Sequence, residues 1–184
     1  MGQALNRLQR LHLTGCLGTL PEWVLHSHIL VKLVLKRSQL TVDPLQQLGE
    51  LLNLKHLELE QAFEVTEMRF EAEKFRELCF LGLDRFDKLA GILVDAGALQ
   101  TLERLSLARC NSLMMVPAFI TTHPKLKCLV LCDMPENFDE AVHRYKVGFA
   151  HMDVKFKVWK NGGPEAVTEW GAESPTSAPG HCKK

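Results

Sequence analysis

A leucine pattern, L-x-x-L-x-L, recurs six times in this chain of 184 residues and constrains its fold more than any other feature. The alternating leucines of each unit predict a short strand, because successive side chains on a strand point to opposite faces. The spacing between units is nearly constant: 22 residues once, then 24 residues four times. The middle leucines of the units are Leu11, Leu33, Leu57, Leu81, Leu105 and Leu129.

One unit shows a longer pattern. The sequence around Leu105 reads Leu102-Glu103-Arg104-Leu105-Ser106-Leu107-Ala108-Arg109-Cys110, and repeats of about 20–29 residues with this pattern are typical of leucine-rich repeats. We expect Cys110 to bond turn backbone where the strand ends. The predicted fold class is α/β: a leucine-rich-repeat solenoid (horseshoe) of about six repeats. A parallel β-sheet forms its concave face, and short helices and turns form its convex face. The alternative, a helical bundle with coincidental leucines, is disfavoured by six matches in phase.

The chain divides into three predicted parts. Residues 1–134 are expected to hold the six leucine-rich repeats without an N-terminal cap, so either another domain precedes them or the isolated chain is marginally stable. Residues 135–159 are expected to form a C-terminal capping unit, with a helix over Glu136–Tyr145 and one more strand around Val154–Val158. Residues 160–184 are rich in Gly, Pro, Ser and charge, and we expect them to be disordered.

The segments between the strands are less regular than the strands. A helix is predicted over Asp43–Leu52, with Asp43 as N-cap and Pro44 at the first helical position. Its buried stripe is expected to comprise Leu45, Leu48 and Leu52. The segment Leu89–Val94 is compatible with a short strand or a tight helical turn. Further core residues are expected at Met68, Phe70 and Phe75.

Composition and charge exclude several classes of protein. The 22 basic and 22 acidic residues give a net charge of zero, which argues against a nucleic-acid binder, since such proteins need a basic surface. There is no run of about 18 apolar residues, so no membrane span is expected. The six cysteines contain no C-x-x-C pair, which favours free thiols in a reducing compartment and a cytoplasmic location.

No catalytic or cofactor motif accompanies the repeat. The chain lacks a G-x-x-x-x-G-K-[ST] loop, a G-x-S-x-G elbow and an H-E-x-x-H motif, so we expect neither an enzyme nor a cofactor. His26 and His28 have no third ligand nearby in sequence, so no metal site is expected. The carboxylates of Glu58, Glu60 and Asp84 are better explained as a surface charge ladder, in which Glu60 pairs with Lys36 of the neighbouring strand.

The outward positions of the predicted strands form one broad surface, because neighbouring strands lie about 4.8 Å apart. Phe80 and Val34 are apolar side chains on this surface, and two explanations stay open for them. They are either exposed anchors for a partner or packed against their neighbours on the same face. We predict a protein-binding concave face formed by Arg10, His12, Lys32, Val34, Lys36, Arg37, His56, Glu58, Glu60, Phe80, Asp84, Arg85, Arg104 and Arg109.

Several segments carry a more specific resemblance: Leu20-Pro21-Glu22-Trp23-Val24, Leu40-Thr41-Val42-Asp43-Pro44-Leu45, Asn53-Leu54-Lys55-His56-Leu57-Glu58-Leu59 and Asp133-Met134-Pro135-Glu136. Over roughly residues 5–158 the chain resembles the C-terminal leucine-rich repeats of plant intracellular immune receptors, the coiled-coil NB-ARC LRR class of disease-resistance proteins. In that family this region contacts a pathogen effector or a guarded host protein, and it holds an upstream nucleotide-binding domain closed.

The resemblance implies a non-catalytic protein–protein recognition module, the sensor end of such a receptor. Its partners would be a pathogen effector or guarded host protein and, within a longer receptor, the upstream nucleotide-binding domain. The family's nucleotide-binding motifs are not in this sequence, so its switching chemistry does not transfer. The alternative is a truncated structural fragment, or a stand-alone repeat scaffold, with no ligand-sensing role of its own.

Overall fold

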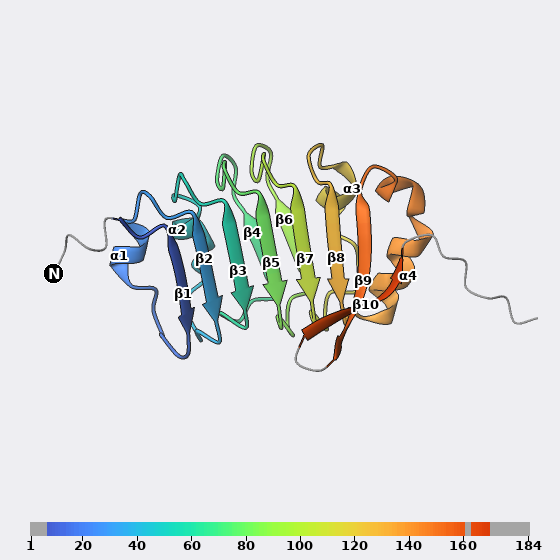
Figure 1. Ribbon diagram of the computed structural model, residues 1–184, viewed down its shortest axis with the longest axis horizontal. Helices are drawn as coiled ribbons and strands as arrows, with labels where there is room; N and C mark the ends of the chain where they lie inside the picture. Colours follow the sequence, from blue (N-terminus) through green and yellow to red (C-terminus); the bar gives the residue numbers. More distant parts are fainter. Residues whose placement is uncertain (1–6, 161–162, 170–184) are drawn as a thin grey trace, which may run out of the picture.

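The computed structural model describes residues 7–160 and 163–169, and in them the chain is an α/β protein built on one large, mostly parallel sheet (Figure 1). The sheet has eight strands in the order β1-β2-β3-β5-β7-β8-β9-β10, and only β10 runs antiparallel to its neighbour. The predicted α/β class and parallel sheet are therefore confirmed. The strands are β1 (Arg10–Thr14), β2 (Lys32–Lys36), β3 (His56–Glu60), β5 (Phe80–Asp84), β7 (Arg104–Ala108), β8 (Cys128–Cys132), β9 (Asp153–Lys160) and β10 (Gly163–Glu169).

The register of the parallel strands repeats without a shift from β1 to β8. Each middle leucine lies opposite the next one, from Leu11 and Leu33 to Leu105 and Leu129. From Leu33 onward the middle leucines are completely buried. A slip of one residue would turn every leucine to the solvent face, so burial of the leucines specifies this register.

Short elements return the chain from one large-sheet strand to the next. They are the helices α1 (Glu22–Leu25), α2 (Leu45–Leu48) and α3 (Ala118–Thr122), and the two-stranded parallel sheet of β4 (Glu67–Phe70) and β6 (Gly91–Val94). Their apolar side chains and the leucines of the large sheet form one core. The prediction that Met68, Phe70 and Phe75 are core residues is confirmed, since none is more than 2% exposed. Of the two possibilities for Leu89–Val94, the strand is correct.

Helix α2 is shorter than the sequence predicts. It begins at Leu45, so Pro44 is the N-cap and the prediction of Asp43 as N-cap is wrong by one residue. Asp43 still accepts a hydrogen bond from the backbone N–H of Leu45, over 2.8 Å, and the helix has ended by Gly49. Leu45 and Leu48 are buried as expected, whereas Leu52 is 66% exposed, which corrects its assignment to the buried stripe. The physical reason is that the backbone leaves the α-helical pattern after Gly49. The N–H groups of Glu50 and Leu51 donate to carbonyl oxygens three residues earlier, and in this tighter turn Leu51, 4% exposed, lies in the core in place of Leu52.

Cys110 bonds turn backbone, as its position in the repeat predicts. Its Sγ donates to the carbonyl oxygen of Ala108 over 3.5 Å, and the residue is fully buried. Burial raises the pKa of the thiol to about 12, so the thiol stays protonated and acts as a structural group.

The C-terminal part continues the sheet. Helix α4 (Glu136–Arg144) and the 3-10 helix η2 (Lys146–Phe149) lead into β9, which pairs with β8 and confirms the predicted extra strand. Phe138 and Val142 of α4 are buried, but Tyr145 is 61% exposed because the helix ends before it. No described helix combines the length and the apolar character that crossing a membrane requires.

Part of the predicted disordered tail is a strand. Lys160 is the last residue of β9, and Gly163–Glu169 forms β10 along the edge of β9. The edge of β9 has unpaired backbone N–H and C=O groups, and the segment that follows can form hydrogen bonds with them. Composition alone does not predict this pairing. Residues 161–162 and 170–184, the rest of that prediction, lie outside the described residues.

Asp139 of α4 makes the stability of this end depend on pH. Burial raises the pKa of its carboxyl from 3.8 to about 6. The folded chain therefore binds this proton more tightly than the unfolded chain, and stability is lost as the pH rises from about 4 to about 6. We expect Asp139→Asn to raise the free energy of unfolding at pH 7.5 by about 1 kcal/mol, a figure reduced for partial exposure, and to change it little at about pH 4.

Urea unfolding of the two proteins at both pH values measures this difference. The control is Glu136→Gln, which neutralises an exposed carboxylate in the first turn of the same helix. Equal gains from the two substitutions at pH 7.5 would show that burial of Asp139 has no special cost.

Candidate functional site

The large sheet exposes three rows of side chains on the face away from the leucine core, which we call the polar sheet face. The rows are made by the first, third and fifth residues of each short strand, and the constant register aligns them across the sheet. Eleven of the fourteen predicted binding residues lie in these rows: Arg10, His12, Lys32, Val34, Lys36, His56, Glu58, Glu60, Phe80, Asp84 and Arg104.

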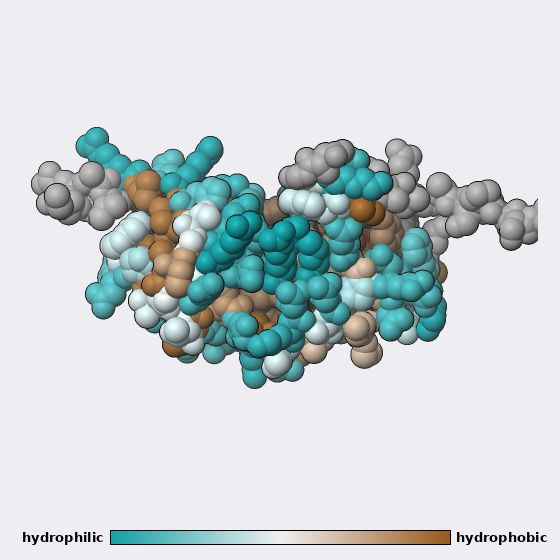
Figure 2. Space-filling model, turned by 90° about the horizontal axis from the view of Figure 1, so that it is seen from below, coloured by the Kyte–Doolittle hydropathy of each residue, from teal (hydrophilic) through white to brown (hydrophobic). Residues whose placement is uncertain are grey.

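The other three, Arg37, Arg85 and Arg109, directly follow their strands. Each has a positive φ, of 51°, 56° and 48° respectively. This left-handed conformation costs a non-glycine residue about 1 kcal/mol or more. In each case the backbone N–H donates to a carbonyl oxygen of the next strand, at 2.7–3.0 Å, which offsets part of that cost. The turn thereby sets three arginines along the carboxyl ends of the strands, and Figure 2 shows hydrophilic side chains gathered over the middle of this edge.

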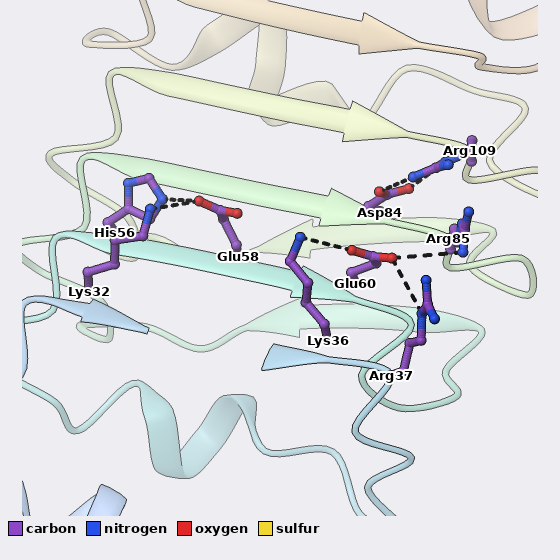
Figure 3. Close-up of polar contacts among 9 residues, drawn as sticks. All are labelled: Lys32, Lys36, Arg37, His56, Glu58, Glu60, Asp84, Arg85 and Arg109. Carbon is purple, nitrogen blue, oxygen red and sulfur yellow. Dashed lines mark hydrogen bonds and ion pairs between the residues drawn. The ribbon is translucent and has the colours of Figure 1, made fainter. Parts of the chain in front are cut away.

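Glu60 is the centre of the largest ion cluster on the polar sheet face (Figure 3). One carboxylate oxygen lies 3.1 Å from Lys36 Nζ, which confirms the predicted charge ladder. The other lies 3.9 Å from Arg37 Nε and 3.8 Å from Arg85 Nη1. The Glu60 side chain is only 14% exposed, so three cations share one partly buried negative charge.

A second cluster joins β2, β3 and β5 at the other end of the strands. Glu58 accepts hydrogen bonds from Lys32 Nζ at 2.9 Å and from His56 Nε2 at 2.5 Å. Burial alone would raise the pKa of the Glu58 carboxyl, but these two donors outweigh it and leave the pKa below its ordinary value. The His56 ring also stacks on Phe80, with ring centroids 4.2 Å apart.

The two apolar residues of the predicted surface are packed within it. Val34 lies in the middle row between His12 and Glu58 and is only 3% exposed, so it is not an anchor that a partner can reach. Phe80 is half-buried beneath its contact with His56. The sequence left open whether Val34 and Phe80 are exposed anchors or pack against their neighbours. Val34 packs against its neighbours. One side of the Phe80 ring is covered by His56.

The third cluster includes a residue that the sequence analysis did not single out. Arg109 donates to both carboxylate oxygens of Asp84, through Nε at 2.8 Å and through Nη2. Its guanidinium also lies over the Trp159 ring, 3.9 Å from the centroid. The backbone N–H of Trp159 donates to Asp133 at 3.0 Å, which helps hold the indole there. The sequence feature that could have identified Trp159 is its position directly after the alternating apolar residues Val154, Phe156 and Val158, at the end of β9.

These clusters surround a groove of about 380 Å³ on the polar sheet face. Its lining includes the small residues Gly82, Ser106 and Ala108 together with Trp159 and Pro164. A Cβ at Gly82 would lie 3.1 Å from the Phe80 ring and 3.4 Å from Glu58 Cγ, so a side chain there would crowd both neighbours. The shape of the groove therefore depends on the absence of a side chain at Gly82.

A larger cavity of about 880 Å³ lies outside the predicted surface. It is lined in part by Met114, Met115, Tyr145 and Val147, all of which are exposed apolar or aromatic side chains. Helix α4 ends at Arg144, and Tyr145 directly after it lines this cavity. Within residues 7–160 and 163–169, no three His, Cys, Asp or Glu side chains are grouped to hold a metal ion.

The comparisons with known proteins do not assign the chain to a family. No protein-family model matches it, and no curated protein does. The case for a function therefore rests on the repeat, the sheet and the clusters described above.

Proposed function

We propose that this chain is a leucine-rich-repeat solenoid that acts as a non-catalytic protein–protein recognition module. The observation that carries the proposal is the polar sheet face: three aligned rows of side chains, with most of the charged residues in the first and third rows, backed by a continuous leucine core. Solenoids of this kind present extended surfaces to macromolecular partners, because each repeat adds one more strand to the same face. The same repeat supports a count of about six and a horseshoe shape.

The segments that resemble plant coiled-coil NB-ARC LRR receptors support a narrower form of the proposal. In it, the chain is the sensor end of an intracellular immune receptor in the cytoplasm. Its partner is a pathogen effector or a guarded host protein, and an upstream nucleotide-binding domain receives the signal. The residues that would meet the partner are the exposed members of the polar sheet face and the arginines that follow the strands.

Arg104 is the best position at which to test this surface. Charge reversal at Lys36 or Arg37 would also break their contacts with Glu60, so a loss of binding there would be ambiguous. Arg104 is exposed on β7, and among the described residues it forms no ion pair. Its substitution therefore changes the surface charge without breaking a contact of that kind.

We expect Arg104→Glu to lower capture of partner proteins by about tenfold or more, since a reversed charge at an interface repels what the original attracted. Proximity labelling in plant tissue, with the chain fused to a biotin ligase, measures this effect by quantitative mass spectrometry. The matched control is Lys88→Glu, a charge reversal at an exposed lysine that pairs with Glu64 outside the polar sheet face. Circular dichroism and thermal melting check that both variants fold.

An identical set of captured proteins for the original chain, Arg104→Glu and Lys88→Glu would contradict the proposal. That result would favour the alternative, a structural fragment or scaffold without a sensing role. A loss common to both variants would point to net charge and not to this surface.

A further inference from the structure

The groove on the polar sheet face, taken together with the residues that contact its carboxylates, has a positive charge, although the chain as a whole is neutral. Three carboxylates line it: Glu58, Glu60 and Asp84. Seven cations line the groove or contact one of these carboxylates: Lys32, Lys36, Arg37, Arg85, Arg104, Arg109 and Lys157. Even when Asp133, which holds Trp159, is included, the cations outnumber the carboxylates by three, whereas the net charge of the chain is zero.

Several of these cations have capacity for a further negative group. Arg104 and Lys157 line the groove and form no ion pair within the described part of the chain. Arg37 and Arg85 share Glu60 with Lys36 at distances near 4 Å, and their side chains are 62% and 37% exposed. A guanidinium has five N–H donors, so one long contact leaves most of them available.

The same groove also has apolar surface for a ligand. Trp159 is 38% exposed, and Phe80 and Val130 contribute to the lining. The groove has a volume of about 380 Å³, which falls within the range of about 300–1,000 Å³ that is usual for ligand sites. An extended peptide with acidic side chains next to an apolar one matches this groove, since the acidic side chains can pair with its cations and the apolar one can contact its aromatic side chains.

We propose that this groove binds an acidic segment of a partner protein, with its carboxylates at Arg104, Lys157 and the arginines around Glu60, and an apolar side chain against Trp159. A nucleic acid fits less well, because Glu58, Glu60 and Asp84 would repel the evenly spaced phosphates of its backbone. Carboxylates on a peptide can instead be spaced so that they avoid these three groups. This inference rests on the proposed recognition function and specifies the chemistry of the partner.

Selection of random dodecapeptides displayed on phage, with the full chain as bait, tests the inference directly. We expect the enriched peptides to contain two or more Asp or Glu residues beside a large apolar residue. Fluorescence anisotropy then measures the affinity of the most enriched peptide. We expect its Kd to rise about tenfold or more between about 50 mM and about 500 mM salt, because exposed charges are screened.

Two double variants test the residues. The first combines Arg104→Gln with Lys157→Gln in the groove. The control combines Lys88→Gln with Lys125→Gln and removes two exposed lysines outside the groove. We expect the first pair to weaken the peptide about tenfold or more and the control pair to change it less than about twofold. Circular dichroism checks that both fold, and the salt titration of the original chain tests the charge independently of any variant.

Three results would overturn the inference: no enrichment, enrichment of peptides without excess acidic residues, or equal weakening by the two pairs. Full displacement of the peptide by a single-stranded oligonucleotide of equal charge would also overturn it, in favour of a nucleic-acid site. Failure here is distinct from failure of the proposed function. If Arg104→Glu lowers capture of partner proteins while no acidic peptide binds, the polar sheet face recognises a protein by other chemistry.

Discussion

Leu81→Ala is expected to lower the free energy of unfolding by about 3–4 kcal/mol, the largest effect on stability that we predict for a single truncation. Leu81 is the middle residue of β5, it is completely buried, and it lies between Leu57 and Leu105 of the neighbouring strands. Truncation removes buried apolar surface and leaves a cavity, and two flanking strands limit how far the site can collapse. Urea unfolding followed by circular dichroism measures the change.

The matched control is Leu52→Ala, the same substitution at a leucine that is 66% exposed. It should cost less than about 0.5 kcal/mol, since little apolar surface returns to water. Comparable losses at the two positions would contradict the assignment of Leu81 to the core and of Leu52 to the surface.

His123→Ala is expected to lower the free energy of unfolding by about 2–3 kcal/mol through a different mechanism. His123 is 8% exposed, and its Nε2 lies 2.9 Å from the carbonyl oxygen of Leu99. Its Nδ1 accepts from the backbone N–H of Lys125 at 3.3 Å, so Nε2 is the nitrogen that donates. The ring thus connects the segment after α3 to the preceding return segment. Truncation leaves the backbone N–H of Lys125 without this acceptor and removes one of the two hydrogen bonds that the Leu99 carbonyl accepts, the other coming from the backbone N–H of Leu102 at 2.9 Å.

Thermal and urea unfolding measure this loss, and Thr122→Ala is the control. Thr122 is the exposed neighbour of His123, and its hydroxyl donates only to Ala118 within the same short helix. An equal cost for both substitutions would mean that the bridge to Leu99 contributes nothing beyond local helix stability. Recovery of part of the loss by His123→Gln, whose amide can also donate and accept, would add support for the hydrogen bonds.

The charge ladder shows how far sequence reasoning reaches into the candidate site. The pairing of Lys36 with Glu60 follows from the leucine register alone, because both are the last residues of adjacent strands. The cluster around Glu60 does not, since Arg37 and Arg85 reach it from turn residues whose side-chain directions depend on a left-handed backbone. Pattern reasoning identified most members of the surface and the Lys36–Glu60 pair, but it did not identify the contacts made by the turn residues.

Three further features came only from the structure. Val34 is buried among longer neighbours, although it lies in a row expected to be exposed. Trp159 meets Arg109 because β9 extends beyond the end of β8, and a period of leucines says nothing about that length. Gly163–Glu169 becomes a strand because β9 offers it an edge, although its composition resembles that of a disordered tail.

What the amino-acid sequence determined by itself is the position, direction and register of the parallel strands. A period of two within each unit and a constant spacing between units leave one arrangement that turns the paired leucines of every unit toward the core. What only the tertiary structure decided is the groove, with the cations gathered in and around it, the small residues of its lining and Trp159 beside them. Those properties arise from contacts between side chains of strands and turns that lie far apart in sequence. The directions and the burial of these side chains are set only when the strands lie side by side.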